Sequence, residues 1–492
     1  MDKLKIAFIT PEAVPFAKTG GLADISGVLP GVLSQMGHTV RLFMPYYKQV
    51  RENFPNLKSL DENYEYLIGD KSHKAQFYFL RDDDIGLEVY FVGNSHFYHR
   101  DELYRDSASG KDYNDNLDRF VFFCKAVLDL IQKRNLKTDI YHANDWQTAL
   151  IPSYIKTKYR DDSFYAGAAT VFTIHNMAYQ GLFPAEDFDK VSLEKSYFAP
   201  EGPFEFWGKL NLMKSAISYA DIISTVSPTY AGEIQESSEY GMGLEGVLKG
   251  RAGDLYGVLN GVDYSAWSPE KDRLVPHRYF IKNFSGKKKN KLELLHRAGF
   301  PVRMEHPLIG MISRLDNQKG FDLIRDIMDE ILKFDLQFVL LGTGAPEYHR
   351  IFEDYGRKFP DKFKPFLTFD NRLAHLIEAG SDIFLMPSRY EPCGLNQMYS
   401  LKYGTVPIVR KTGGLADTVD NFNENTLEGT GFVFKEYTSE ALLETIKRAV
   451  RIFGRRRVWY KIMKQGMLRD YSWENSAGQY IELYQKALNK VR

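Results

Sequence analysis

The chain has little cysteine, no excess of either charge and no long apolar run. Its 492 residues include two cysteines, Cys124 and Cys393, too few for a disulfide framework, and this favours a reducing compartment. Basic and acidic residues both number 64, so we expect no generic attraction to nucleic acid or to an anionic membrane. No stretch approaches membrane-spanning length, and prolines interrupt the N-terminal apolar run too early for a signal peptide. These absences predict a cytoplasmic protein that binds neither nucleic acid nor membrane.

The chain does contain an internal repeat. The sequence Lys-Thr-Gly-Gly-Leu-Ala-Asp occupies residues 18–24 and again residues 411–417. Each copy follows an apolar run that predicts a buried strand, and a helix-spaced apolar series follows the first copy. A strand, a cationic glycine turn and a helix start can together bind an anion, because glycines permit close approach and the first helical N–H groups are unpaired. The repeat therefore predicts two similar domains with a phosphate-bearing ligand between them.

Short apolar runs alternate with helical patterns along the whole chain. Continuous rather than alternating hydrophobicity is typical of parallel strands covered on both faces, so we predict an α/β protein with two doubly wound, Rossmann-like domains. The N-terminal domain is predicted to span residues 1–260 and the C-terminal domain residues 261–470, with a helix at 471–492 that packs back on the N-terminal domain. The predicted strands include residues 6–9, 40–44, 89–92, 140–141, 170–174 and 222–226, then 308–312, 338–341, 383–386, 406–409 and 432–434.

Candidate site residues follow the strands of the first half, because ligands of open parallel sheets bind at the carboxyl ends of strands. His175 follows residues 170–174, and Asp145 and Trp146 follow residues 140–141. A neutral histidine could hydrogen-bond a sugar hydroxyl, and a structural role is equally consistent. Asp145 could hold a ligand hydroxyl, although a helix cap is favoured. Trp146 could either stack on a sugar or fill the core.

Charged residues follow two strands of the second half. Arg314 and Lys319 lie five positions apart after residues 308–312. They could converge on one dianionic group, or they could be a surface charge pair. Glu391 lies between prolines and a glycine after residues 383–386, which favours a functional carboxylate. Cys393 has no histidine beside it in the sequence, so we interpret it as a packing residue or a backbone contact.

Two further motifs are incomplete as a cofactor site and as a metal site. Residues 342–344, Gly-Thr-Gly, are a fragment of a dinucleotide fingerprint, but no acidic partner follows at the expected spacing. The three aspartates at 82–84 could in principle hold a divalent cation, but they precede a strand and are better explained as a solvated turn. We therefore expect neither a redox cofactor nor a metal.

Taken together, these segments resemble the bacterial glycogen synthase and plant starch synthase family. That family consists of glucosyltransferases with the GT-B fold, in which two Rossmann-like domains face a deep cleft. The similar segments are residues 18–24, 142–146, 173–176, 179–181, 260–263, 313–315, 318–320, 388–394 and 411–417.

The resemblance implies retaining transfer of glucose from ADP-glucose, or less favourably UDP-glucose, to the non-reducing end of an α-1,4-glucan such as glycogen. The nucleotide sugar is then a substrate, and no cofactor is implied. The implied catalytic residues are Glu391, Arg314, Lys319, His175 and Lys18. The implied substrate-binding residues are Gly20, Gly21, Asp24, Asp145, Trp146, Asn260, Phe369, Cys393, Gly394, Leu395, Thr412, Gly413 and Gly414.

The same resemblance assigns roles within this set. Arg314 and Lys319 would neutralise the diphosphate, with Lys18 contributing from a mobile lid formed by the first repeat copy. The second copy would cradle the donor by its backbone, and Lys411 would be idle. Related enzymes carry a second glutamate eight positions after the first, whereas residue 399 is tyrosine. One carboxylate favours front-face attack assisted by the leaving phosphate over double displacement.

Three alternatives remain open from the sequence. An α-glucan hydrolase would need two carboxylates, for which Asp145 and Glu391 could be proposed, but it would not need the two cations or the repeat. A phosphorylase would release glucose 1-phosphate from glucan. A non-catalytic protein would bind glucan or nucleotide without turnover.

Overall fold

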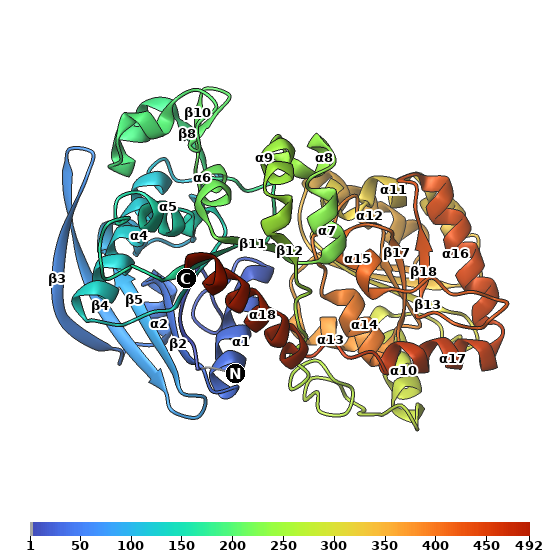
Figure 1. Ribbon diagram of the computed structural model, residues 1–492. Helices are drawn as coiled ribbons and strands as arrows, with labels where there is room; N and C mark the ends of the chain where they lie inside the picture. The colour runs from blue at the N-terminus through green and yellow to red at the C-terminus, as the bar shows by residue number, and fades with distance from the viewer. Residues whose placement is uncertain (1–2) are drawn as a thin grey trace. The chain divides into compact units, whose positions relative to one another are not determined.

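The computed structural model describes residues 3–492, which divide into two compact units (Figure 1). The first unit holds the described residues up to Val226, together with Ala231–Val258 and Trp473–Arg492. The second unit holds Ser227–Tyr230 and Leu259–Ser472. Each unit contains a sheet made mainly or wholly of parallel strands with helices packed on it. The predicted α/β class with two parallel-sheet domains is confirmed.

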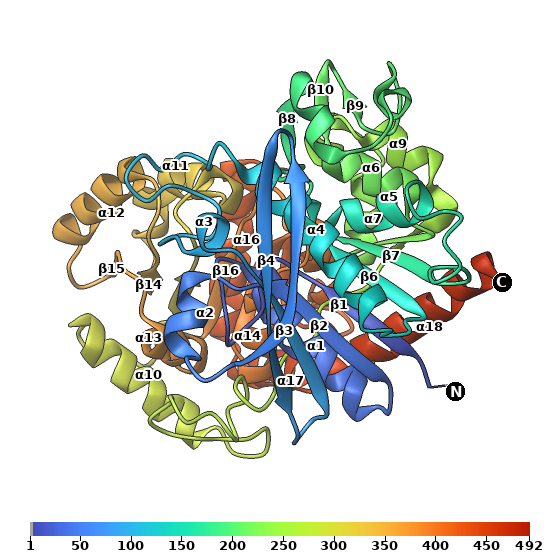
Figure 2. The same ribbon diagram turned by 90° about the vertical axis from the view of Figure 1, so that its left-hand side faces the viewer.

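The first unit is built on a nine-stranded sheet. Its central strands pair in parallel, as the continuous apolar runs predict, and β4 pairs antiparallel with both of its neighbours. The β3–β4 pair forms a long hairpin at one edge (Figure 2). In spatial order the strands are β12 (Leu255–Gly257), β11 (Ile222–Thr225), β7 (Ala169–Ile174), β6 (Ile140–Asn144), β1 (Lys5–Ile9), β2 (Thr39–Pro45), β5 (Leu87–Gly93), β4 (Lys71–Asp82) and β3 (Lys58–Ile68).

Helices cover this sheet with their apolar faces. Helix α1 (Gly21–Gln35) buries Leu22, Ile25, Leu29 and Leu33. Helix α18 (Trp473–Val491) packs on α1 and β7, so the last residues of the chain belong to the first unit. The Tyr484 hydroxyl of α18 lies 2.8 Å from Nδ1 of His142 in β6, a buried polar tie in this contact. Further helices of the unit are α4 (Asn116–Lys133), α5 (Leu150–Lys156), α6 (Leu212–Tyr219) and α9 (Glu245–Gly250).

The second unit is built on a six-stranded sheet that is parallel throughout. Neighbouring residues of a strand enter different cores: Ile383 and Leu385 of β16 pack with one cluster, and Phe384 and Met386 with another. Both faces are therefore covered, which explains the unbroken apolar runs. In spatial order the strands are β15 (Phe363–Phe366), β14 (Gln337–Leu341), β13 (Leu308–Ile312), β16 (Ile383–Met386), β17 (Val406–Arg410) and β18 (Phe432–Phe434).

One face of the second sheet carries α11 (Phe321–Ile331) and α16 (Ser439–Phe453), and the other carries α10 (Ser285–Ala298) and α13 (Asn371–Gly380). In both units the chain reverses its direction across the sheet beside a central strand, between β1 and β6 and between β13 and β16. Such switch points are where open parallel sheets bind ligands at the carboxyl ends of their strands.

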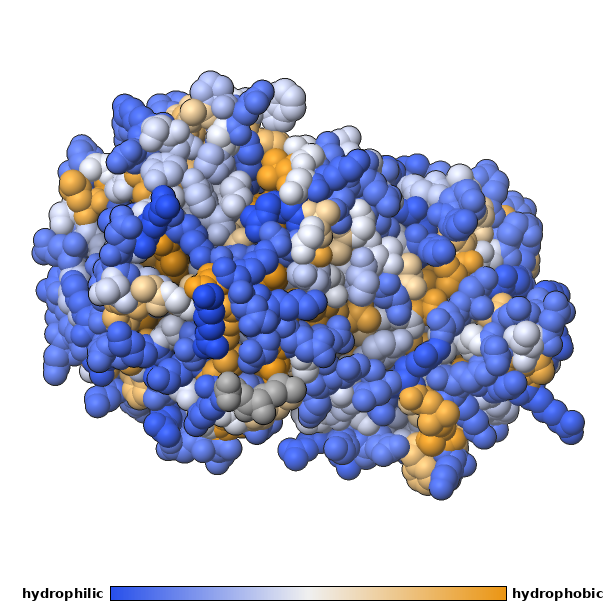
Figure 3. All heavy atoms as spheres, in the orientation of Figure 1, coloured by the Kyte–Doolittle hydropathy of each residue, from blue (hydrophilic) through white to orange (hydrophobic). Residues whose placement is uncertain are grey.

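Hydrophilic residues cover most of the face shown in Figure 3. Within residues 3–492, no helix is both long and apolar enough to cross a membrane.

Candidate functional site

In the first unit, the carboxyl ends of β1, β6 and β7 bring together Asp145 and His175. The backbone N–H of His175 donates to Oδ1 of Asp145 over 2.8 Å, and Nδ2 of Asn144 donates to the carbonyl of Ile9 over 3.1 Å. These bonds join three neighbouring strands at one edge of the sheet. The two predicted residues therefore lie in one polar cluster at the β1–β6 switch point.

Asp145 holds the backbone of the neighbouring strand end. It has φ +56° and forms no side-chain cap on the short helix that follows, so the helix cap favoured by the sequence is wrong. The pKa of Asp145 is raised to about 7. Burial is the largest cause and the charge of Glu12 acts in the same direction, whereas hydrogen bonds from the backbone N–H groups of His175 and Asn176 oppose the shift. A buried carboxylate on a strained backbone, at a strand end, is typical of a functional position.

His175 presents one unprotonated ring nitrogen. Its Nε2 lies 3.0 Å from Oδ1 of Asn144, and that amide already donates through Nδ2 to Ile9, so Nε2 carries the proton. Burial lowers the pKa of His175 to about 3, so the ring is neutral at physiological pH. Its Nδ1 is buried and has no hydrogen-bond partner within residues 3–492. The ring can therefore accept a hydrogen bond from a hydroxyl group.

Trp146 fills the core. Its ring centroid lies 5.1 Å from that of Phe120 and 5.7 Å from that of Phe183. A Cβ atom at Gly181 would lie 2.6 Å from the indole ring, so this glycine, with φ +67°, packs directly on it. The structure thus favours the packing interpretation of Trp146 over stacking on a sugar.

The first repeat copy is an exposed loop that leads into α1. Nζ of Lys18 lies 2.6 Å from Oδ1 of Asp24 in the first turn of the helix. A Cβ at Gly20 or Gly21 would meet nothing within 4 Å, so these glycines leave the backbone open on that side. The loop can therefore present its backbone at Gly20 and Gly21, and the Lys18 ammonium group, to a ligand.

Glu12 ties this loop to the sheet, and the sequence prediction missed it. The N–H of Thr19 donates to Oε2 of Glu12 over 2.5 Å, and the N–H of Gly20 donates to the same oxygen over 3.3 Å. Glu12 comes three residues after β1, so the rule of inspecting strand ends would have found it.

In the second unit, the ends of β13 and β16 bring a cation and an anion together. Nζ of Lys319 lies 2.6 Å from Oε2 of Glu391, and the Ser388 hydroxyl donates to the same oxygen over 3.0 Å. Both charged side chains are largely buried. Arg314 lies nearby in the chain but is exposed, with Nη2 3.7 Å from Oδ2 of Asp316.

The second repeat copy packs tightly on the Glu391 loop. A Cβ at Gly413 would lie 2.0 Å from the Glu391 carbonyl oxygen, and one at Gly414 would lie 2.1 Å from the Cys393 carbonyl oxygen. Gly413 also has φ +42°, and α15 (Gly413–Thr418) begins here with Thr412 as its buried N-cap residue. These glycines are required by close backbone approach.

The turn from the Glu391 loop into α14 (Asn396–Tyr403) is fixed by a buried amide. Nε2 of Gln397 donates to the carbonyls of Cys393 and Gly394, each over 3.0 Å, and Gly394 has φ +73°. Leu395 is the N-cap residue of α14. Residues 393–395 thus form a fixed turn between the Glu391 loop and α14, and their contact with a ligand stays a prediction.

Cys393 and Asn260 are buried neighbours. Burial raises the pKa of the Cys393 thiol to about 12, and hydrogen bonding to Asn260 opposes this shift. The thiol is therefore protonated and is no nucleophile at neutral pH. Oδ1 of Asn260 is buried and lacks a partner among the described residues, so it is available to a ligand.

Two aromatic positions differ in exposure. Phe369, between β15 and α13, is 85% exposed, as a stacking face requires. Tyr399 is buried in α14, with its ring stacked on Trp267 at 4.1 Å between centroids. Position 399 therefore belongs to the core.

No group of side chains in residues 3–492 has the composition and placement to hold a metal ion. The aspartates at 82–84 are exposed, and Oδ1 of Asp82 accepts the N–H of Asp84 over 3.1 Å within the turn after β4. This is the solvated turn that the sequence predicts.

Comparisons with known proteins agree over the whole chain. A family model described as the starch synthase catalytic domain matches residues 5–250, and one for glycosyl transferases group 1 matches residues 295–465. A glycogen synthase of Geotalea daltonii is 46% identical, with 99% of each chain covered. One of Thermotoga maritima is 44% identical, with 99% of this chain and 100% of the relative covered.

Two solved structures are also similar to this chain over almost its whole length. The catalytic domain of starch synthase IV from Arabidopsis thaliana, bound to ADP and acarbose, matches with a TM-score of 0.89 at 32% identity, covering 99% of this chain and all of that one. Sucrose-phosphate synthase from Thermosynechococcus elongatus matches with a TM-score of 0.60 at 17% identity, a likeness of fold alone, again over 99% of this chain and all of that one.

Proposed function

The chain belongs to the glycogen and starch synthase family of glycosyltransferases, and we propose that it transfers glucose from ADP-glucose to the non-reducing end of an α-1,4-glucan. The donor assignment is supported by the starch synthase neighbour, which was solved with ADP. UDP-glucose is the less favoured donor. Glycogen is the acceptor that the names of the bacterial relatives suggest.

The Lys319–Glu391 pair is the observation that carries this proposal. Glycosyl transfer develops negative charge on the departing phosphate and positive charge on the sugar, so fixed charges of both signs stabilise the transition state. Nζ of Lys319 and Oε2 of Glu391 lie 2.6 Å apart at the switch point of the second sheet. We assign Lys319, with Arg314, to the diphosphate and Glu391 to the glucosyl group.

The first unit supplies hydrogen-bond acceptors and one further cation. Nδ1 of His175 is a buried acceptor without a partner within residues 3–492, and we assign it to a glucose hydroxyl. Asp145 fixes the backbone of His175 and adds a carboxylate to the same edge. We assign Lys18, at the start of the exposed repeat copy, to the diphosphate.

Retention of the anomeric configuration is proposed to proceed by front-face attack. Double displacement needs a second carboxylate as nucleophile. Position 399, where related enzymes place one, is a buried tyrosine stacked on Trp267. The leaving phosphate then acts as the base for the incoming 4-hydroxyl, and no cofactor or metal takes part. A cytoplasmic location stays a prediction.

The test is glucose incorporation into glycogen from ADP-glucose, UDP-glucose and GDP-glucose with purified protein. We expect ADP-glucose to be preferred, the product linkage to be α by proton NMR, and Glu391→Gln and Lys319→Ala to lose at least about 100-fold in kcat with an unchanged circular dichroism spectrum.

Other outcomes identify the alternatives. Release of glucose from glycogen without nucleotide would indicate a hydrolase, and glucose 1-phosphate formed from inorganic phosphate a phosphorylase. Unchanged kcat in both variants, or no incorporation from any donor, would reject the proposal.

A further inference from the structure

We propose that Glu12 is a positioning residue of the transfer reaction: its carboxylate holds the first repeat copy, residues 18–24, in the geometry that presents Lys18. This inference rests on the proposed function for its kinetic consequences. Its structural content, that Glu12 orders the loop, stands independently of the reaction.

The Glu12 carboxylate is an acceptor for several donors at once. Besides the N–H groups of Thr19 and Gly20, it accepts the Thr19 hydroxyl over 2.9 Å to Oε1 and the Tyr104 hydroxyl over 3.1 Å. The side chain is buried. A buried carboxylate is stable only when such donors surround it, so the loop and Glu12 hold each other in place.

Packing holds the helical end of this copy, where Leu22 and Ala23 are buried, but it supplies little order to residues 18–21. Lys18, Thr19 and Gly21 are exposed, and a Cβ at Gly20 or Gly21 would meet nothing within 4 Å. The pair between Lys18 and Asp24 is also exposed to water, and exposed ion pairs contribute about 0–1 kcal/mol. The partly buried hydrogen bonds to Glu12 are therefore the strongest constraint on residues 18–21.

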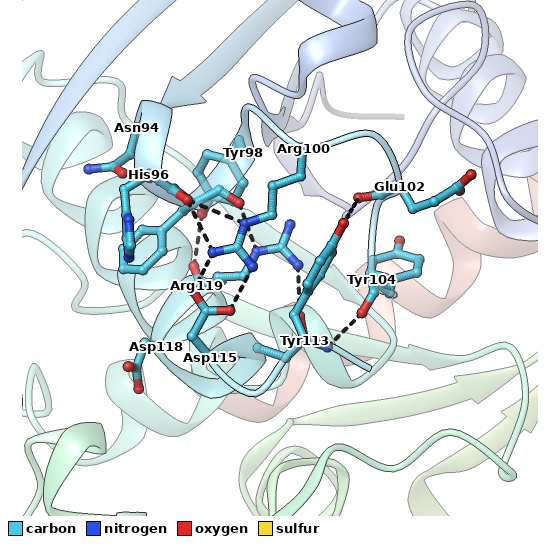
Figure 4. Close-up of polar contacts among 12 residues, drawn as sticks. Asn94, His96, Tyr98, Arg100, Glu102, Tyr104, Tyr113, Asp115, Asp118 and Arg119 are labelled. Atoms are coloured by element: carbon cyan, nitrogen blue, oxygen red, sulfur yellow. Dashed lines mark hydrogen bonds and ion pairs between the residues drawn. The ribbon is translucent and has the colours of Figure 1, made fainter. Parts of the chain in front are cut away.

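Glu12 is itself fixed through Tyr104, which belongs to the loop of residues 99–115 between α3 (Ser95–Tyr98) and α4 (Figure 4). The Tyr104 carbonyl accepts Nδ2 of Asn116 over 3.0 Å. Oδ1 of Asn116 in turn accepts Nη1 of Arg119 over 2.7 Å, and Nε of Arg119 donates to the Phe97 carbonyl over 2.9 Å. Arg119 is fully buried, so this chain of bonds is shielded from water.

The same loop is clamped at Tyr113, whose ring lies against two guanidinium groups (Figure 4). Cζ of Arg100 is 4.5 Å from the ring centroid and Cζ of Arg119 is 5.1 Å from it. Arg100 also makes a bidentate pair with Asp115, with one Nη1–Oδ1 distance of 2.7 Å. The loop that carries Tyr104 is thus a rigid support for Glu12.

Glu12 follows β1, whose Ile9 carbonyl accepts Nδ2 of Asn144 over 3.1 Å, so it lies at the same sheet edge as the polar cluster of the first unit. Its negative charge also raises the pKa of Asp145, the residue that holds the His175 backbone. One carboxylate therefore contacts the Lys18 loop and adjoins the Asp145–His175 edge. This placement is what a residue that aligns several substrate contacts requires.

The main test replaces Glu12 by the isosteric amide. In Glu12→Gln, the negative charge is lost and one acceptor oxygen remains for the four donors that the carboxylate accepts, namely the N–H groups of Thr19 and Gly20 and the hydroxyls of Thr19 and Tyr104. We expect kcat/KM for ADP-glucose to fall about 10- to 100-fold, as for misplaced catalytic groups, with the KM for glycogen unchanged. Hydrogen exchange at the Thr19 and Gly20 amides should accelerate. Glu102→Gln, an exposed carboxylate on the same support loop, is the matched control and should leave both measurements unchanged.

A double-variant cycle separates positioning from a general structural role. Because Glu12 acts through the loop that carries Lys18, Glu12→Gln added to Lys18→Ala should cost less than about twofold further in kcat/KM. Tyr104→Phe, which removes one hydrogen bond and is the milder variant, should give a smaller change in the same direction.

Any one of three results would overturn the proposal. The first is full additivity of the Glu12→Gln and Lys18→Ala effects on kcat/KM. The second is unchanged hydrogen exchange at the Thr19 and Gly20 amides in Glu12→Gln, and the third is an effect of Glu12→Gln confined to the KM for glycogen. If the protein transfers no glucose at all, the exchange measurement still tests whether Glu12 orders the loop.

Discussion

Residues 18–24 and 411–417 have the same sequence, but they lie in opposite kinds of surroundings. In the first copy the loop is exposed, and a Cβ added at either glycine would have no heavy atom of the surrounding structure within 4 Å. In the second copy Thr412, Gly413 and Gly414 are buried, and added Cβ atoms at the glycines would collide with carbonyl oxygens of the Glu391 loop. Local sequence therefore specifies a helix start at the glycine pair twice, and the surrounding chain decides which contacts that start makes.

The two copies also differ in what holds them. The amides of the first copy donate to the Glu12 carboxylate, which is a titratable group. In the second copy the N–H of Gly414 donates to the carbonyls of Glu391 and Pro392, each over 3.2 Å. The first copy is thus held by a side chain whose charge depends on pH, and the second by backbone carbonyls, which do not titrate. The following experiments test this difference.

The largest difference between the two copies is expected in the melting temperatures of their glycine-to-alanine variants. Gly414→Ala should lower the melting temperature by about 4–10 °C and kcat/KM more than about 100-fold, because its Cβ would lie 2.1 Å from the Cys393 carbonyl oxygen. Gly21→Ala, with open space around it, should leave the melting temperature within about 2 °C. Thermal unfolding and donor kinetics measure both. Equal destabilisation by the two variants would refute the contrast.

The lysines give the second comparison. Lys18→Ala should lower kcat/KM for ADP-glucose about 10- to 100-fold, since Lys18 is the cation assigned to the diphosphate. Lys411→Ala should stay within about twofold of the parent, because the Lys411 side chain is exposed and the second copy acts through its backbone. Donor titrations at saturating glycogen measure both values. A larger loss in the Lys411 variant would reverse the assignment of the two copies.

Much of the fold could be predicted from hydrophobicity alone, because parallel strands buried on both faces are continuously apolar. The run at 308–312 is β13 and that at 383–386 is β16, with the predicted bounds. The β3–β4 hairpin was not predicted. Its strands bury one face only, so buried residues such as Ala75 and Phe77 alternate with exposed ones, and Leu67 near the turn is 62% exposed. Such strands lack the continuous apolar run on which the prediction of the other strands relied.

The placement of His175, Lys319 and Glu391 after strands could be predicted, because apolar runs locate the strand ends that these residues follow. A role that depends on tertiary contacts could not be predicted. Trp146 packs in the core because Gly181 and two phenylalanine rings surround it. The Asp145 carboxylate accepts the His175 N–H at the end of the neighbouring strand and does not cap the helix that follows it. No spacing in the sequence reveals which surroundings a side chain will meet.

The aspartates that end the two copies should differ in their contribution to stability. Asp417 accepts the N–H of Thr229 over 2.9 Å and its hydroxyl over 2.7 Å, so Asp417→Ala leaves two donors unpaired and should lower the melting temperature by about 2–6 °C. Among the residues that the structure describes, Asp24 pairs with Lys18 in a partly exposed ion pair, and Asp24→Ala should shift the melting temperature by less than about 2 °C. Differential scanning calorimetry at one pH measures both. A larger shift for Asp24→Ala would show that the first copy is the structural one.

The smallest expected effect is a pH dependence confined to the first copy. Burial raises the pKa of Glu12, although hydrogen bonds from Thr19 and Gly20 oppose the shift, so this carboxyl is protonated at a higher pH than an ordinary glutamate. Lowering the pH then converts the acceptor into a neutral acid and weakens its bonds to the two amides. Carbonyl oxygens do not titrate, so the Gly414 amide has no such response.

Hydrogen exchange between pH 7.5 and pH 5.5, corrected for the intrinsic rate, should therefore show protection falling about two- to fivefold at Thr19 and Gly20 and unchanged at Gly414. In Glu12→Gln the protection of the loop amides should be low and independent of pH, because no carboxyl remains to titrate. A parallel fall at Gly414 would mean that the whole protein loosens in acid. In that case the two identical heptapeptides would not differ in the way their surroundings hold them.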